Sequence, residues 1–351
     1  MAQSSGQPQT ERTTHLPIML TKRQASCIAI TLLTAVGVVA KPPPLSIDEL
    51  RSKAFDTRLE FVSDVKGGDS FDAHLVSYIS AGLKVHALVA TPRGEKPAGG
   101  FPVLVANHGH HPDPPRYGIT AEGVDWRPGD YYRAIPELYA AMGFLVVMPD
   151  YRGHSNSEGF EFTDGMLESL YCTEDVLGLV AALRDIEDAD PQNVFMWGHS
   201  LGGEVTLRAL LAADVVKGAS LWSSVGGDIW DQSFYYSRYK DPLAMDSAER
   251  PKEVIDKLRE DMAALDGPFA WEQGEPLDYL EHLKAPIIIH HAIGDRGAAY
   301  MWAARLAKEL YLRSHPYEFH TYAGEDHLFK GADLEEATAR DGAFFRSLMA
   351  P

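Results

Sequence analysis

Residues 194–203 read VFMWGHSLGG, a Gly-x-Ser-x-Gly pattern between an apolar run and a helix-forming run that extends to Ala213. This order predicts a sharp strand-to-helix turn that lifts the Ser200 hydroxyl above a sheet and points the helix N-terminus at it. A Cβ at Gly198 or Gly202 would crowd the neighbouring strand and helix. The pattern therefore indicates a serine nucleophile. The alternative is a glycine-rich turn in which Ser200 only caps the helix.

A serine nucleophile needs a histidine base and an acid that orients the base, and at such a turn the three follow in the order Ser, Asp, His. Residues 286–291 form a β-branched run that predicts a buried strand, and the loop after this strand carries Asp295. Residues 317–322 alternate as a strand does and lead to a loop with His327. We therefore expect Asp295 to be the acid and His327 to be the general base.

Other titratable residues lie near these positions. His290, His291 and His320 fall inside the predicted strands, where a satisfied or solvent-facing histidine is expected. Glu325 and Asp326 are interpreted as surface charges of the loop rather than as the acid.

The negative charge that develops on the substrate oxygen needs two hydrogen-bond donors. One is the backbone N–H after the nucleophile, at Leu201. A predicted strand at residues 102–107 is followed by His108-Gly109-His110. We expect the second donor to be the His110 backbone N–H, with Gly109 allowing the loop to fold tightly against the site.

These motifs together resemble the catalytic domain of prolyl oligopeptidase-type α/β-hydrolases, a group that includes acylaminoacyl-peptidase-like members and single-domain esterases. The resemblance runs from about Leu75 to the C-terminus. It rests on Tyr151-Arg152-Gly153, Asp190-Pro191-Gln192-Asn193-Val194, the Ser200 motif, His291-x-x-x-Asp295 and Gly324-Glu325-Asp326-His327. Two positions depart from the family pattern: His110 stands where the family usually has glycine, and Ala292 replaces the glycine after His291.

Strand and helix patterns alternate along most of the chain, which predicts an α/β-hydrolase fold with a mostly parallel central sheet and helices on both faces. Strands are expected at 71–79, 84–90, 103–107, 145–149, 194–197 and 218–223, and helices at 131–142, 167–186 and 201–213. A helical, cap-like insertion is expected at about 227–284, before the acid-bearing strand. Its aromatic residues could line a substrate pocket or pack the insertion onto the body. They are Trp230, Phe234, Tyr235, Tyr236, Tyr239 and Trp271.

The N-terminal 40 residues predict an extension with a secretory signal peptide. Lys22 and Arg23 precede an uncharged run, Ala25–Ala40, that ends in small residues before Lys41 and three prolines. The run is shorter than the ~20 apolar residues of a membrane helix. We expect export to a periplasm or the outside, with residues 41–351 forming one hydrolase domain without a β-propeller, and Met1 or Met19 as the start.

Composition restricts the partners. The net charge is −18, and loss of residues 1–40 would make it about −20. We therefore expect neither nucleic acid nor a stable membrane association among the partners. Cys172 would be the only cysteine left and is expected in the core, so no disulfide is predicted. No cofactor and no metal are expected, and the sequence does not indicate an oligomeric state.

The leading hypothesis is an exported serine hydrolase that cleaves carboxylic esters through an acyl-enzyme. The first alternative is a serine peptidase or amidase acting on short peptides, although no acidic pair in the sequence can be assigned to a substrate amine. A more distant alternative is a metal-dependent hydrolase using His108, His110, His111 and Asp113, since imidazoles suit zinc. A catalytically silent binding protein is disfavoured by the complete triad.

Overall fold

The structure is a computed structural model that describes residues 41–120, 131–163, 165–237, 252–324 and 326–349. The predicted signal peptide lies outside these residues, so its cleavage stays a prediction that N-terminal sequencing of the mature protein would test. Within the described part of the chain, no helix is both long and apolar enough to span a membrane.

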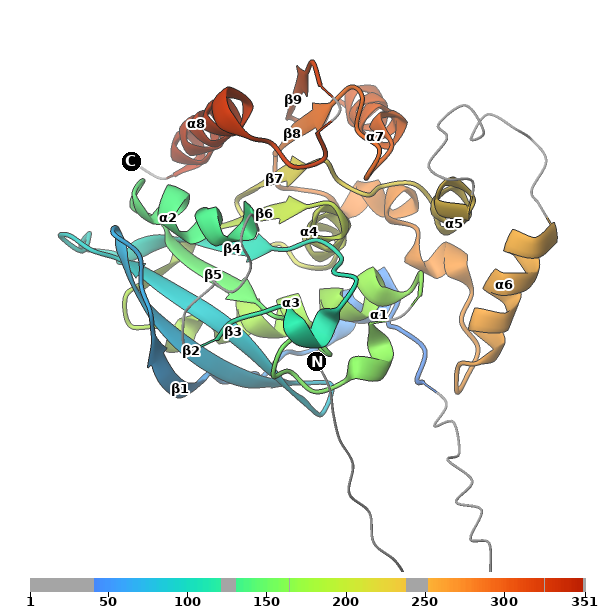
Figure 1. Ribbon diagram of the computed structural model, residues 1–351, viewed down its shortest axis with the longest axis horizontal. Helices are drawn as coiled ribbons and strands as arrows, with labels where there is room; N and C mark the ends of the chain where they lie inside the picture. The colour runs from blue at the N-terminus through green and yellow to red at the C-terminus, as the bar shows by residue number, and fades with distance from the viewer. Residues whose placement is uncertain (1–40, 121–130, 164, 238–251, 325, 350–351) are drawn as a thin grey trace, which may run out of the picture. The chain divides into compact units, whose positions relative to one another are not determined.

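A nine-stranded sheet forms the centre of the fold (Figure 1). Its strands lie in the order β1-β2-β3-β5-β4-β6-β7-β8-β9. The strands from β5 to β9 in this order run parallel, and β1, β2 and β3 form an antiparallel edge. The strand bounds are Glu60–Val65, Phe71–Ser80, Leu83–Pro92, Phe101–Asn107, Leu145–Pro149, Ala189–His199, Gly218–Trp222, Ile287–Ala292 and Tyr317–Tyr322 for β1 to β9.

The parallel strands are apolar along most of their length because helices cover both faces of the sheet. Every residue of β5, β7 and β8 is buried. The predicted strands are all present, within a few residues of the expected bounds except β6, which begins at Ala189. β1 has no counterpart in the prediction: it is an edge strand with mostly exposed residues, so its sequence lacks the apolar signal of the others.

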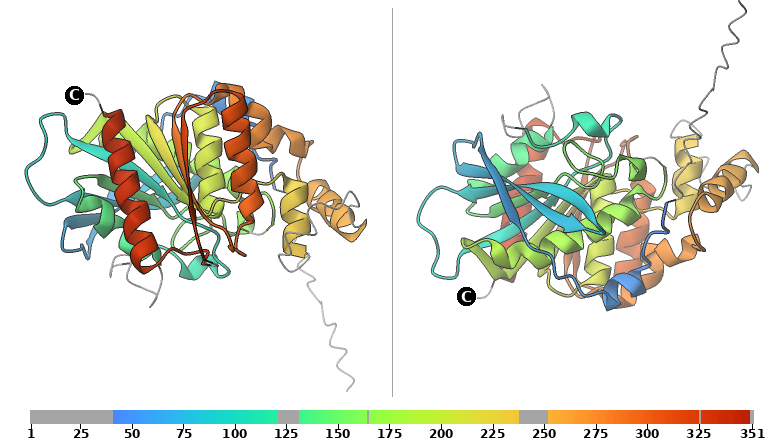
Figure 2. Two further views of the ribbon diagram at one scale, coloured as in Figure 1. Left: turned by 90° about the horizontal axis from the view of Figure 1, so that it is seen from above. Right: turned by 90° about the horizontal axis from the view of Figure 1, so that it is seen from below.

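The helices pack on the two faces of the sheet. Helices α1, α3, α4 and α7 bury their apolar side chains in one core, and α2 and α8 do so in the other. Figure 2 shows α8, in red, on one side of the strands and α4 and α7 on the other. The bounds of these helices are Ile47–Ser52, Ala134–Ala140, Glu168–Ala182, Leu201–Ala212, Tyr300–Leu312 and Gly331–Leu348 for α1, α2, α3, α4, α7 and α8. The predicted α/β fold with a mostly parallel sheet is confirmed.

Two predicted helices are shorter than expected. Where a helix is predicted at 131–142, the structure has a 3-10 turn, Tyr131–Arg133, followed by α2. Helix α2 ends at Ala140, and Gly143 then takes a positive φ. The prediction at 167–186 ends as an α-helix at Ala182 and continues as a 3-10 turn to Asp185. Both ends are tightened turns, which apolar periodicity does not distinguish from α-helix.

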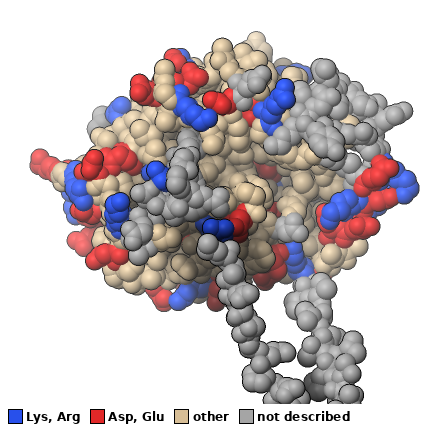
Figure 3. All heavy atoms as spheres, viewed as in Figure 1, with Lys and Arg blue, Asp and Glu red and all other residues tan. Residues whose placement is uncertain are grey.

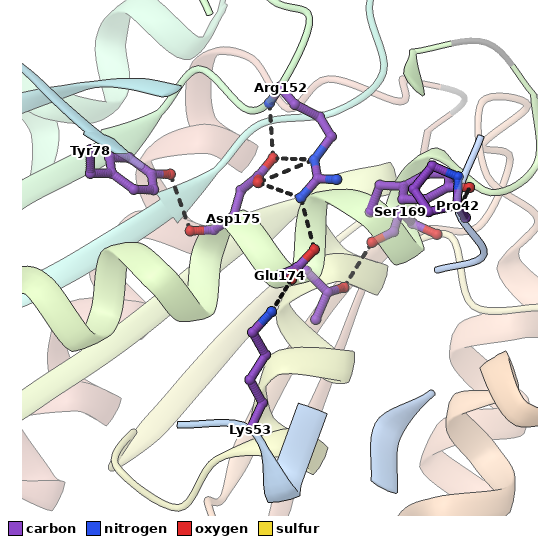
Figure 4. A network of polar contacts seen from close by, with 9 residues as sticks. Pro42, Lys53, Tyr78, Arg152, Ser169, Glu174 and Asp175 are labelled. Atoms are coloured by element: carbon purple, nitrogen blue, oxygen red, sulfur yellow. Dashed lines mark hydrogen bonds and ion pairs between the residues drawn. The ribbon is translucent and has the colours of Figure 1, made fainter. Parts of the chain in front are cut away.

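A buried ion-pair network fixes α3 against the sheet (Figure 4). The guanidinium of Arg152, in the loop after β5, donates to Asp175 at 2.7 Å and to Glu174 at 3.1 Å. Lys53 bonds the same Glu174, and Tyr78 of β2 donates to the Asp175 carbonyl. Because planar guanidinium groups hold carboxylates in a fixed geometry, this network sets the position of the helix that starts at Glu168.

The described part of the region expected as the insertion, 227–237 and 252–284, contains α5 (Ile229–Ser237), α6 (Lys252–Ala263) and two 3-10 helices (Trp271–Gly274 and Pro276–His282). Ile229 and Leu258 pack with residues of the segment that leads into α3. Figure 3 shows acidic and basic side chains interspersed over one face of the molecule, including the ridge formed by α6.

Candidate active site

Ser200 stands at the turn between β6 and α4, close to the centre of the sheet. Its backbone has φ 56° and ψ −123°, a conformation that residues other than glycine rarely adopt. The Ser200 N–H donates to the Trp222 carbonyl of β7 at 3.0 Å, which anchors the turn. Strain of this kind is expected at a nucleophile elbow and not at an ordinary helix cap.

The glycines beside Ser200 act sterically as the sequence predicts. A Cβ at Gly198 would lie 2.2 Å from the Gly202 carbonyl oxygen, and a Cβ at Gly202 would lie 2.1 Å from the Asn107 carbonyl oxygen. The close packing brings the first turn of α4 against the end of β4, where the His108-Gly109-His110 loop begins.

Asp295 and His327 meet although they are far apart in sequence. His327, between β9 and α8, donates from Nδ1 to the Asp295 carboxylate at 2.8 Å. The same carboxylate accepts the Gly297 N–H at 2.6 Å and the Ala298 N–H at 3.1 Å. Burial opposes ionisation of Asp295, but the hydrogen bond and charge of His327 outweigh it, so the pKa is lowered. An ionised Asp295 keeps the His327 proton on Nδ1 and leaves Nε2 available as a base.

The competing histidines make their hydrogen bonds to other groups. His290 is fully buried, with Nε2 3.0 Å from Asp341 and Nδ1 2.8 Å from the Tyr322 hydroxyl. Nε2 of His291 lies 3.2 Å from the Ala298 carbonyl and 3.6 Å from the Asp295 carboxylate, and His320 bonds Glu318 in its own strand. Asp326 is exposed and Glu325 lies outside the described residues.

The loop after β4 lies directly against Ser200. A Cβ at Gly109 would come within 3.0 Å of Ser200 Cβ, so glycine is the residue that permits the approach. Leu201 is the first residue of α4, where the backbone N–H has no partner within the helix. Leu201 and His110 both line one cavity with Ser200 and His327. The two residues expected to supply the oxyanion donors therefore border the same cavity as Ser200.

That cavity has a volume of about 510 Å³. Met166, Val225 and Tyr236 supply its apolar surface, and Glu168, Glu204 and Gln232 its polar surface. The volume suits a small organic molecule.

The histidines of the metal hypothesis face different partners. His108 packs on the Tyr151 ring, with Nδ1 2.8 Å from the Gly109 carbonyl. His110 pairs with Glu168 at 2.8 Å, and His111 accepts the Asp113 N–H at 3.0 Å. Among the described residues, no three His, Cys, Asp or Glu side chains are grouped so that they could hold a metal ion.

The sequence profile of the prolyl oligopeptidase family matches residues 130–350. This chain belongs to the prolyl oligopeptidase family. It is a serine hydrolase, and its described residues contain the α/β sheet but no β-propeller.

Individual relatives of this family member include both peptidases and esterases. The uncharacterized peptidase YtmA of Bacillus subtilis is 25% identical over 256 residues, which make up 73% of this chain and 86% of the relative. The acetyl xylan esterase from Paenibacillus sp. R4 has a similar structure (TM-score 0.61, 17% identity, 89% of this chain and 98% of that chain). So does the acylaminoacyl peptidase of Pyrococcus horikoshii (TM-score 0.61, 19% identity, 80% of this chain), but the match covers only 42% of that chain. The two structural matches show the shared fold.

Two carboxylates in the cavity of this family member were not found from sequence. Glu168 begins α3 and Glu204 lies in the first turn of α4, and both are buried. Burial raises the pKa of Glu204, although Arg208, Ser169 and Gln232 act in the opposite direction. Glu204 lies four residues after Ser200, and this helical spacing could have placed it beside Ser200. Glu168 has no such signal.

Some of the predicted insertion aromatics whose side chains the structure describes pack the insertion onto the body. Phe234 and Tyr235 are buried, and Tyr235 packs on Trp302 of α7. Tyr236 differs: it lines the cavity and donates to the Gly297 carbonyl at 3.1 Å. Tyr239 lies outside the described residues. Cys172 is buried in α3, as predicted, and burial raises the pKa of its thiol.

Glu275 links the insertion to the pH dependence of stability. Burial, together with Asp228 and Glu204, raises its pKa to about 8. A carboxyl whose folded-state pKa is raised holds its proton in the folded state over a range where the unfolded chain has lost it, so stability falls as pH rises from about 4.5 towards 8. We expect the Tm to drop between about pH 5 and pH 8, and Glu275→Gln to reduce this drop. Glutamine retains an acceptor for the Ile229 N–H. Equal drops in both proteins would contradict the assignment.

Proposed function

We propose that this protein hydrolyses carboxylic esters through an acyl-enzyme on Ser200. The observation that carries the proposal is the meeting of Ser200, at a strained elbow, with the His327–Asp295 pair at one cavity. Ser200 Oγ attacks the ester carbonyl carbon while His327 Nε2 takes the hydroxyl proton. The Leu201 and His110 N–H groups stabilise the oxyanion.

Collapse of the tetrahedral intermediate breaks the ester C–O bond, and His327 gives its proton to the departing alcohol. A water molecule then attacks the acyl-serine, with His327 again taking the proton, and the acid is released. Throughout, Asp295 holds the His327 ring in the tautomer that keeps Nε2 available and stabilises the imidazolium that forms.

Two considerations favour an ester over an amide. An alcohol is a better leaving group than an amine, so a triad needs less assistance from substrate-binding groups to cleave an ester. In addition, the similarity to the acetyl xylan esterase extends over nearly the whole of both chains, whereas the similarity to the acylaminoacyl peptidase covers less than half of that protein.

A peptidase acting on short peptides with a free amino group is the second candidate. It is favoured by Glu168 and Glu204, which line the cavity beside Ser200 and could meet a substrate ammonium. Against it, Glu168 already pairs with His110, and burial disfavours the charged form of Glu204.

A matched pair of substrates separates the two candidates. We expect kcat/KM for a short acyl group presented as a p-nitrophenyl ester to exceed that for the same group presented as an anilide by more than their intrinsic reactivities differ. Blocking the amino group of an aminoacyl ester is expected to change kcat/KM little. A strong preference for anilides with a free amino group, lost on blocking, would overturn the esterase proposal and favour the peptidase.

A further inference from the structure

A directed chain of hydrogen bonds runs beneath the nucleophile from the oxyanion loop to the loop of the general base. The Gly109 N–H donates to the Tyr132 hydroxyl at 2.9 Å. The Tyr132 hydroxyl bonds Nδ1 of His199, and Nε2 of His199 lies 2.9 Å from the His327 carbonyl oxygen. His199 is the residue immediately before Ser200, and its ring is buried.

The donors and acceptors of this chain are fixed by chemistry. The His327 carbonyl can only accept, so His199 must carry its proton on Nε2. Nδ1 of His199 is then bare and accepts from the Tyr132 hydroxyl, whose own oxygen accepts the Gly109 N–H. Burial lowers the pKa of His199 well below its ordinary value, so the ring stays neutral.

Each end of the chain holds a group that the proposed reaction requires. Gly109 directly precedes His110 in the loop. Anchoring the Gly109 N–H therefore restricts the direction of the His110 N–H, the expected oxyanion donor. The other end holds the backbone of His327, while Asp295 holds its ring. The His199 and His327 rings lie 4.5 Å apart between centroids.

We propose that Tyr132 and His199 are positioning residues that hold the oxyanion loop and the general base in register with Ser200. The proposal rests on the proposed Ser200 hydrolysis and adds to it a role for the variable residue of the Gly-x-Ser-x-Gly motif. Groups held this way are aligned before the charge develops in the transition state, so their loss should lower kcat more than it raises KM.

The test is a set of variants assayed on one ester substrate. Tyr132→Phe removes both hydroxyl contacts and is expected to lower kcat about 10- to 100-fold while KM changes less than about threefold. Tyr139→Phe is the matched control, because it removes the hydroxyl of another tyrosine, which is buried in the core and bonded to Asp341. Its kcat should stay within about twofold of the unaltered enzyme.

Substitutions of His199 test the two hydrogen bonds of its ring. In His199→Gln the amide can still donate to the His327 carbonyl, whereas His199→Ala retains neither contact. We expect kcat to fall in the order unaltered enzyme, His199→Gln, His199→Ala. Equal kcat for these two variants, or a Tyr132→Phe enzyme whose kcat matches the Tyr139→Phe control, would overturn the proposal. The Ser200→Ala variant, assayed in parallel, tests the proposed function separately. Substantial residual activity in this variant would show that Ser200 is not the nucleophile, whatever the result for Tyr132 and His199.

Discussion

Replacement of Ser200 by alanine is expected to lower kcat/KM for the best ester substrate by about 10⁴-fold or more. Alanine removes the oxygen that we propose forms the acyl-enzyme and leaves the cavity and the His327–Asp295 pair in place. The change is measured by steady-state hydrolysis of a p-nitrophenyl ester, with background hydrolysis subtracted.

Folding is not expected to suffer, because alanine has no greater difficulty than serine with the positive φ of this turn. Circular dichroism and the Tm provide the control. A folded Ser200→Ala protein that retains more than a small fraction of the activity would show that the nucleophile lies elsewhere.

Replacement of Asp295 by asparagine is expected to lower kcat about 10³- to 10⁴-fold with little change in KM. The Gly297 and Ala298 N–H groups donate to Oδ1, so the amide oxygen of asparagine should occupy that position. The amide NH₂ would then face Nδ1 of His327, which would have to accept and would place the proton on Nε2. A base protonated on Nε2 cannot take the Ser200 proton.

Asp326→Asn is the control for this experiment, because Asp326 lies one residue before His327 but is exposed. Its kcat should remain close to that of the unaltered enzyme. A larger loss of kcat in Asp326→Asn than in Asp295→Asn would show that Asp295 is not the acid of the triad.

The sequence alone predicts those parts of the candidate site that depend on short, local sequence patterns. The turn at Ser200 is encoded by two glycines within five residues, and the strands before Asp295 and His327 have strong β-branched or alternating patterns. Parallel strands bring their following loops to one edge of the sheet, so the chain order of Ser200, Asp295 and His327 also predicts that they meet.

The sequence was not sufficient where the site depends on contacts between distant segments. Glu168 enters the cavity because the Arg152 network fixes α3, and neither its burial nor its neighbour His110 follows from local pattern. Tyr132 reaches His199 from a 3-10 turn that periodicity assigns to a longer helix. The exposed strand β1 was missed for a related reason, since an edge strand lacks an apolar face that would reveal it.

The central claim is that Ser200 is the residue that becomes acylated, and phosphonylation tests it most directly. A p-nitrophenyl alkylphosphonate should release about one equivalent of nitrophenol per chain, abolish esterase activity in proportion, and leave its adduct on the peptide that contains Ser200. The Ser200→Ala protein should release none above background. An adduct on another residue that accounts for the lost activity, or full activity after stoichiometric labelling of Ser200, would contradict the account.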